Sequence, residues 1–168
     1  PANTQHNCDV LAQAGFLVVM PDFFRGSGRG QEGFERPDSD VVDAELANVV
    51  LPFVKEKGGE TIGLVGFCFG GGVAARAAST GLLACVGGIH ASGLTPELAA
   101  ETKVPMMMLQ AGNDPDLAPV VEVLKDTDVY DKCVMRQVRR PRVPLPRCAL
   151  MEPSPAASEH RSLPALDP

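Results

Sequence analysis

The chain has 168 residues, 45% of them hydrophobic, and a formal net charge of −6. This length suits one domain with a buried core, and the negative charge argues against a nucleic-acid partner. Apolar runs are too short to span a bilayer, and the first residues show no signal pattern, so we expect no membrane association. The five cysteines have no C-x-x-C spacing, which argues against disulfides and zinc. We therefore expect a cytoplasmic protein with no metal or other cofactor.

The first 60 residues predict two helices around one strand. Residues 3–14 have helical apolar spacing, and residues 16–20 (FLVVM) form the continuous apolar run of a strand buried on both faces. Residues 23–37 are a glycine-rich loop. A second helix is expected from residue 38 or 39 to about 57, with Pro52 causing a kink or an early end.

Residues 61–79 (TIGLVGFCFGGGVAARAAS) predict a strand, a glycine-rich turn and an alanine-rich helix. The G-x-C-x-G pattern at this turn is typical of a nucleophile elbow with Cys68 as the nucleophile. Because such a turn crowds the backbone, we expect small residues two positions before and two after Cys68. The pattern matches neither a dinucleotide loop nor a phosphate-binding P-loop, but a buried, purely structural cysteine stays an alternative.

The rest of the first 138 residues continues the alternation of strands and helices. Strands are expected at 82–89, 104–110 and 131–138, and helices at 95–101 and from 119 to 126. Uniformly apolar strands that alternate with helices predict an α/β fold, with a mostly parallel sheet and helices on both faces.

Polar residues gather where the predicted strands end. Asp22, Cys68, His90 and the Asn113–Asp114 loop each follow a strand. Ligand sites of parallel sheets lie at the carboxyl ends of strands, so these residues should share one edge. Their placement favours the catalytic interpretation of Cys68.

The composition changes near residue 135. Residues 1–131 carry 8 Lys/Arg and 18 Asp/Glu, whereas residues 132–168 carry 7 and 3, and seven of the 15 prolines lie in 141–168. We expect a partial α/β-hydrolase domain over 1–134 and a Pro/Arg-rich, disordered tail over 135–168.

Three segments resemble the dienelactone hydrolase family of the α/β-hydrolase fold. They are residues 12–26 (AQAGFLVVMPDFFRG), residues 62–71 (IGLVGFCFGG), and residues 104–105 together with 112–114 (VP, GND). The cysteine at the elbow is the specific part, because most α/β-hydrolases use serine. The resemblance covers about residues 5–130, and implies a chain that lacks the family's first strands and diverges after about residue 135.

The resemblance implies a Cys-His-Asp triad in which Cys68 is the nucleophile and Asp114 the acid, with Asp116 as a rival. It also implies that the backbone N–H of Phe69 belongs to the oxyanion hole. In the family a second N–H comes from a loop that would precede residue 1 of this chain.

The resemblance does not supply a base in the expected place. The family's histidine follows the last strand, but the only histidine after Asp114 is His160, in the proline-rich tail. His90 is an alternative base or a substrate-binding residue. Arg25 resembles a substrate-carboxylate arginine, although a solvated loop residue is the simpler interpretation.

We expect, from the resemblance, a hydrolase that cleaves a lactone or small carboxylic ester through a thioacyl-enzyme, inactive if the triad histidine is missing. The partner would be a small-molecule substrate. Two alternatives stay open: a non-enzymatic truncated or spliced product, suggested by the switch near residue 135, and a thiol sensor that uses Cys68.

Overall fold

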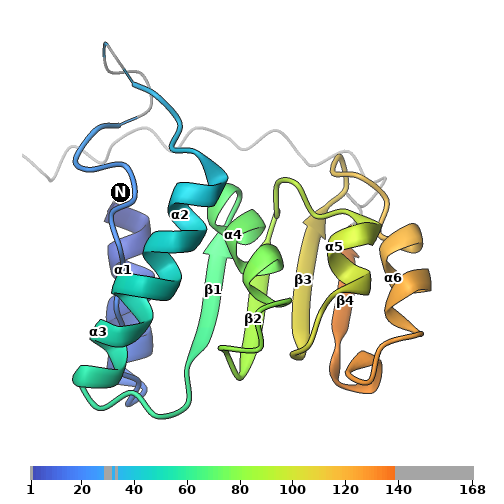
Figure 1. Cartoon of the computed structure of the whole chain (residues 1–168). Coiled ribbons are helices and arrows are strands. Elements are labelled where there is room, and N and C mark those ends of the chain that lie inside the picture. The colour runs from blue at the N-terminus through green and yellow to red at the C-terminus, as the bar shows by residue number, and fades with distance from the viewer. Residues whose placement is uncertain (1, 29–31, 33, 139–168) are drawn as a thin grey trace, which may run out of the picture.

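In the computed structural model, which describes residues 2–28, 32 and 34–138, four parallel strands form one sheet (Figure 1). Their order in the sheet is their order in the chain: β1 (Gly63–Phe67), β2 (Cys85–Ile89), β3 (Met106–Ala111) and β4 (Val134–Val138). The carboxyl ends of all four strands therefore meet at one edge. The α/β class and the parallel sheet predicted from the sequence are confirmed.

Short helices precede and connect these strands. They are α1 (Ala2–Gln13), α2 (Ser39–Glu45), the π-helical turn η1 (Leu46–Val50), α3 (Leu51–Glu56), α4 (Phe69–Ala77), α5 (Pro96–Ala100), α6 (Ala118–Leu124) and the 3-10 turn η2 (Tyr130–Lys132). Each helix expected from the sequence is present. None in the described part of the chain is long and apolar enough to cross a bilayer.

The helical run from α2 to α3 shows how the chain accommodates a proline. Asp38 caps its start, where the side chain accepts a hydrogen bond from the N–H of Asp40 at 2.8 Å. Pro52 has no N–H to donate, and the π-helical turn η1 lies immediately before it. The backbone stays helical to Glu56, so the helix does not end early at Pro52, which was one of the two effects expected of it. The chain instead forms a wider turn before the proline.

The prediction of a strand at residues 16–20 is wrong. The segment has no regular secondary structure, and Phe16 and Leu17 are 65% and 52% exposed. A strand needs a neighbour to pair its backbone N–H and C=O groups. In the described sheet β1 is the edge strand, paired to β2, and no described strand lies beside residues 16–20. An apolar composition therefore did not suffice without a pairing partner.

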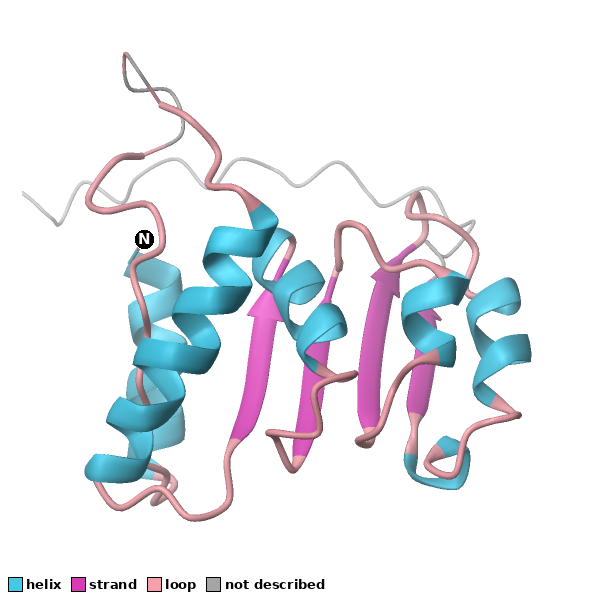
Figure 2. Ribbon diagram, viewed as in Figure 1, coloured by secondary structure: helices cyan, strands magenta, loops and turns pink. Residues whose placement is uncertain are grey.

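The two faces of the sheet differ. Figure 2 shows α2, α4, α5 and α6 in front of the sheet, where they bury Val86, Met106 and Met108. Alternate residues point the other way, and Val65 and Met107 are 55% and 39% exposed there. We expected helices on both faces, but on this second face the described residues leave apolar strand side chains exposed.

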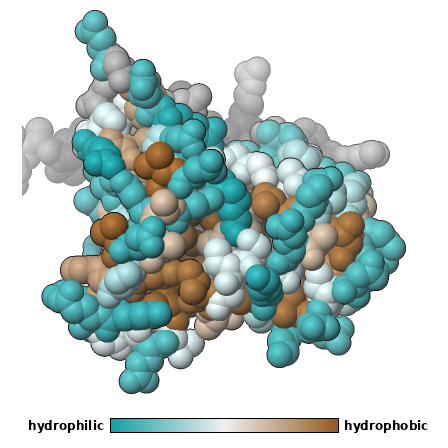
Figure 3. All heavy atoms as spheres, viewed as in Figure 1, coloured by the Kyte–Doolittle hydropathy of each residue, from teal (hydrophilic) through white to brown (hydrophobic). Residues whose placement is uncertain are grey.

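Apolar side chains are also exposed around the α2–α3 run. Val41, Val49 and Phe53 lie there, and Figure 3 shows the apolar surface at this side of the molecule. At the other end of the sheet, α5 and α6 bury a smaller cluster formed by Ala99, Leu117, Val120 and Leu124. Both clusters meet at Cys133 and Met135, so β4 is packed into the domain.

Strand β4 reaches Val138, four residues past the boundary expected after residue 134. The basic segment that starts near residue 135 therefore overlaps with β4, in which Arg136 is exposed. The division into a domain and a tail stays a prediction, because residues 139–168 lie outside the described part.

Two consecutive methionines test the assignment of faces. Replacing the fully buried Met108 by Ala should lower the free energy of unfolding by about 2–5 kcal/mol, because it removes core contacts and leaves a cavity. Met107→Ala, on the exposed face of the same strand, should cost less than about 1 kcal/mol. Urea unfolding curves of both variants give the comparison. Equal losses would contradict the description of an open second face.

Candidate active site

Cys68 is the single residue between β1 and α4. Its backbone has φ 51° and ψ −108°, a region that side-chain-bearing residues rarely adopt. Such a conformation costs about 1–3 kcal/mol and persists only where the surroundings fix it. The thiol is exposed and, among the described residues, has no hydrogen-bond partner. A strained, exposed cysteine at the start of a helix is the elbow expected from the sequence.

The backbone of Cys68 is fixed by the end of β2, the segment that follows it, and the first turn of α4. Its N–H donates to the carbonyl oxygen of Ile89 at 3.0 Å. Its carbonyl oxygen accepts from the N–H and the hydroxyl of Ser92, at 3.0 and 3.2 Å, and from the N–H of Gly72 at 3.2 Å. Four hydrogen bonds thus hold the strained residue in place.

The glycines of the elbow have unequal roles. A Cβ at Gly66, two residues before Cys68, would lie under 3.0 Å from the carbonyl oxygen of Gly70, and one at Gly72 would lie as close to that of Ser92. A Cβ at Gly70, two residues after Cys68, meets nothing within 4 Å. The expected need for a small residue is therefore confirmed before Cys68 but wrong at Gly70. The crowded positions after Cys68 are Gly71, where an added Cβ would lie 2.8 Å from Cα of Ala91, and Gly72, because α4 packs against the segment that follows β2.

This difference makes a matched pair of variants. Gly66→Ala should abolish the elbow, because neither the strand nor the helix backbone can move by the required amount without losing its hydrogen bonds. Gly70→Ala should fold normally and gain up to about 1 kcal/mol, because alanine is the better helix residue. Circular dichroism and thermal melting measure both effects. A stable, native-like Gly66→Ala protein would contradict this account.

Phe69 begins α4, and its N–H has no acceptor within the helix, as expected of a first-turn residue. Its ring packs against Phe24, with centroids 5.2 Å apart, and under the guanidinium of Arg36 at 4.8 Å. The loop after residue 22 therefore folds over the start of α4. The oxyanion-hole role of the Phe69 N–H stays a prediction, and the geometry leaves that group available for it.

The two loop arginines differ in their surroundings. Arg25, which the sequence suggested for substrate binding, pairs with Glu45 of α2. Arg36 instead stacks on Phe69 and donates to the Ser92 hydroxyl at 3.3 Å, next to the Cys68 carbonyl group. Sequence reasoning missed Arg36 and Ser92, since only the folded loop brings them to the elbow.

His90 and Asp114 form a pair at the ends of β2 and β3. Nδ1 of His90 lies 2.6 Å from Oδ1 of Asp114, whose side chain is 7% exposed, whereas that of His90 is 53% exposed. His90 also has a positive φ of 53°. The sequence suggested Asp114 as the acid and His90 as a substrate-binding residue or a substitute base. The structure brings these two side chains into contact.

Neighbouring amide groups fix the Asp114 loop. Oδ2 of Asp114 accepts from the N–H of Ala111 at 2.7 Å, and Gln137 of β4 donates to the carbonyl oxygens of Ala111 and Asp114 at 3.3 and 3.2 Å. The hydrogen bond from His90 is the main cause that lowers the pKa of Asp114; partial burial opposes it, and the Ala111 N–H adds to it. Asp114 is thus held as a carboxylate.

The lowered pKa of Asp114 predicts a pH dependence. Asp114 stabilises the fold through its carboxylate above its ordinary pKa of about 4, and this contribution disappears as the pH falls through the lowered value. Asp114→Asn should therefore be less stable than wild type at pH 7, and the difference should shrink toward pH 3. Urea unfolding at several pH values measures this. A difference that grows on acidification would contradict the assignment.

The other candidates lie elsewhere or are engaged. Asp116 accepts from the N–H of Ala118 at the start of α6, and Asp22 accepts from the N–H groups of Phe24 and Gly26 in its own loop. His6 is exposed on α1. His160 lies outside the described residues, so its suggested role as base stays a prediction.

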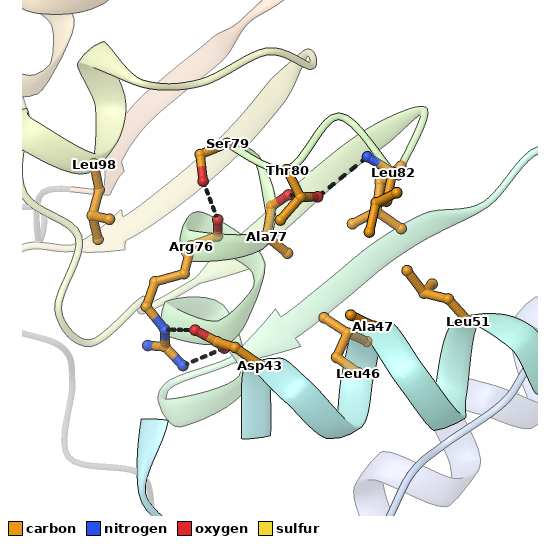
Figure 4. Close-up of a pocket in the computed structure, with 11 residues that line it drawn as sticks. Asp43, Leu46, Ala47, Leu51, Arg76, Ala77, Ser79, Thr80, Leu82 and Leu98 are labelled. Atoms are coloured by element: carbon orange, nitrogen blue, oxygen red, sulfur yellow. Dashed lines mark hydrogen bonds and ion pairs between the residues drawn. The ribbon is translucent and has the colours of Figure 1, made fainter. Parts of the chain in front are cut away.

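A cavity of about 250 Å³ lies between the α2–α3 run and the C-terminal end of α4 (Figure 4). Its walls are mostly apolar, and the ion pair of Arg76 with Asp43, with Nε–Oδ2 at 2.7 Å, closes one side. Cys68 is at the opposite end of α4. This cavity is therefore separate from the candidate active site.

A parallel sheet with a strained cysteine at the turn between β1 and α4, and a carboxylate in the loop after β3, fits an α/β-hydrolase fold, of which the described residues form a part. The profile of the dienelactone hydrolase family matches residues 1–124, and the chain belongs to that family. It is also similar to an endo-1,3;1,4-beta-D-glucanase of Zea mays, at 29% identity over 115 residues. That match covers 66% of this chain and 38% of the relative.

Proposed function

We propose that this chain is a hydrolase of the dienelactone hydrolase type that cleaves a lactone or a small carboxylic ester, with Cys68 as the nucleophile. The observation that carries the proposal is the strained backbone of Cys68, held by four hydrogen bonds while the thiol stays exposed. Strain of this kind collects at functional sites, where it fixes a reacting group. A purely structural cysteine would be buried and unstrained.

The position of Cys68 suits attack on a carbonyl carbon. The N-terminus of the nine-residue helix α4 stabilises a thiolate through the helix dipole. The thiolate adds to the carbonyl carbon, the Phe69 N–H stabilises the resulting oxyanion, and loss of the alcohol leaves a thioester on Cys68. Water then releases the acid and regenerates the thiol.

The glucanase relative raises glycoside hydrolysis as a second substrate class. That chemistry typically uses two carboxylates that flank the scissile bond. The Asp114 carboxylate is engaged by His90 and the Ala111 N–H, and that of Asp22 by its own loop. The Cys68 thiol, in contrast, has no hydrogen-bond partner among the described residues, which favours acyl transfer over glycoside cleavage.

A second observation bears on thiol sensing. The Cys68 thiol is exposed and needs no base to react with an oxidant, so a sensor remains the alternative function. Hydrolysis of esters separates the two functions, because a sensor has no turnover.

Hydrolysis of p-nitrophenyl acetate and of a small unsaturated lactone tests the proposed enzyme, with a mixed-linkage β-glucan as the third substrate. Cys68→Ala should reduce ester and lactone turnover by at least about 10³-fold, because it removes the nucleophile. Cys85→Ala is the matched control, since Cys85 is also an exposed thiol but lies at the opposite end of its strand. Equal rates for wild type and Cys68→Ala, or turnover of the glucan alone, would overturn the proposal.

A further inference from the structure

We propose that His90 is the general base for Cys68, and that Asp114 orients it. This inference rests on the proposed hydrolase function and names the proton acceptor that the function needs. It places the base after β2, the strand next to the one that precedes Cys68. In the family, the histidine is expected after the last strand.

The register of the sheet brings Cys68 and His90 together. Phe67 and Ile89, the last residues of β1 and β2, are paired with each other. Cys68 directly follows Phe67, and His90 directly follows Ile89. Cα atoms of paired residues on neighbouring strands lie about 5 Å apart. The N–H of Cys68 also donates to Ile89, so this spacing continues past the strands. Both side chains therefore leave the sheet at the same edge.

The contact with Asp114 defines which ring nitrogen of His90 can act. Nδ1 is occupied as the donor to Oδ1 at 2.6 Å. In the neutral ring this leaves the lone pair on Nε2, which is the proton-accepting arrangement of a histidine beside a nucleophile. The imidazole is 53% exposed, so its free side borders the space that substrate and water enter.

A purely structural role explains the pair less well. The ends of β2 and β3 are already joined, because the His90 N–H donates to Leu109 at 2.8 Å and the buried Gln110 makes two hydrogen bonds to Ala91. A further link between them does not require the strained φ of 53° at His90. Positive φ values at both Cys68 and its neighbour across the sheet support the view that both side chains are held for one task.

The proton movements balance in this scheme. His90 Nε2 takes the thiol proton of Cys68 as the sulfur bonds to the carbonyl carbon, and returns it to the leaving alkoxide when the C–O bond breaks. Nε2 next takes a proton from water as the water oxygen attacks the thioester. When the C–S bond breaks, that proton returns to the sulfur. The sum is ester plus water giving acid plus alcohol.

The surroundings of this pair suit proton transfer from sulfur to nitrogen. The Asp114 carboxylate faces His90 from the loop after β3 and can balance the positive charge that the imidazole gains during the reaction. The N-terminus of α4 faces the negative charge that develops on Cys68. Arg36 lies on the other side of the elbow, where it donates to the Ser92 hydroxyl.

His90→Asn tests the base without removing the geometry. Asparagine adopts a positive φ more readily than most residues, and its amide can still donate to Asp114. Its kcat/KM should fall by about 10²–10⁴-fold, with little change in the melting temperature. The rate of iodoacetamide labelling of Cys68 at pH 7 should also fall several-fold, because the variant lacks the group that takes the thiol proton. His6→Asn, on the exposed face of α1, should change none of these quantities.

Two results overturn the inference. One is a His90→Asn variant whose Cys68 is labelled by iodoacetamide at the wild-type rate, a result that counts even if the chain has no measurable turnover. The other is full ester hydrolysis by His90→Asn while Cys68→Ala is inactive, because the proposed function would then stand with another base. His160→Asn, made in parallel, shows whether that other base lies in the tail. Loss of activity in neither the Cys68 nor the His90 variant would instead reject the proposed function.

Discussion

The close packing of the first turn of α4 against the ends of β1 and β2 is the constraint on which the site depends. A side chain at Gly66 or Gly72 would occupy space taken by backbone, so helix and strands can approach only because these positions are glycine. That approach lets Ser92 and Gly72 donate to the Cys68 carbonyl oxygen. The strained conformation of Cys68 is thus a consequence of helix–sheet packing rather than a local preference.

The order of the sheet then determines what surrounds the thiol. Because sequential strands are also neighbours, the segments after β1, β2 and β3 follow one another along a single edge. The next strand contributes as well, since Gln137 of β4 donates to the Asp114 loop from the far side. Each strand therefore supports the candidate residue that follows the strand before it, and Gln137 does this from the last described strand.

The sequence predicted most of the fold because local signals and tertiary structure agreed. Capping by Asp38, the glycine-rich elbow and the apolar runs of β1 to β4 all appear where their patterns indicated. Residues 16–20 failed because pairing, not composition, decides whether an apolar run becomes a strand. At the candidate site, the sequence suggested Cys68, Asp114 and His90. It could not show that Asp114 contacts His90 or that Arg36 reaches Ser92, because those contacts depend on loop conformations that no spacing encodes.

The carboxylate of Asp114 links the ends of β2 and β3. Oδ2 accepts from the Ala111 N–H and Oδ1 from His90, and the side chain is almost completely buried. Since each carboxylate oxygen has two lone pairs, these contacts alone do not use all of its capacity as an acceptor. They do decide which histidine the carboxylate orients in the described part of the chain. That histidine is His90, and its strained backbone is what brings its ring to Oδ1.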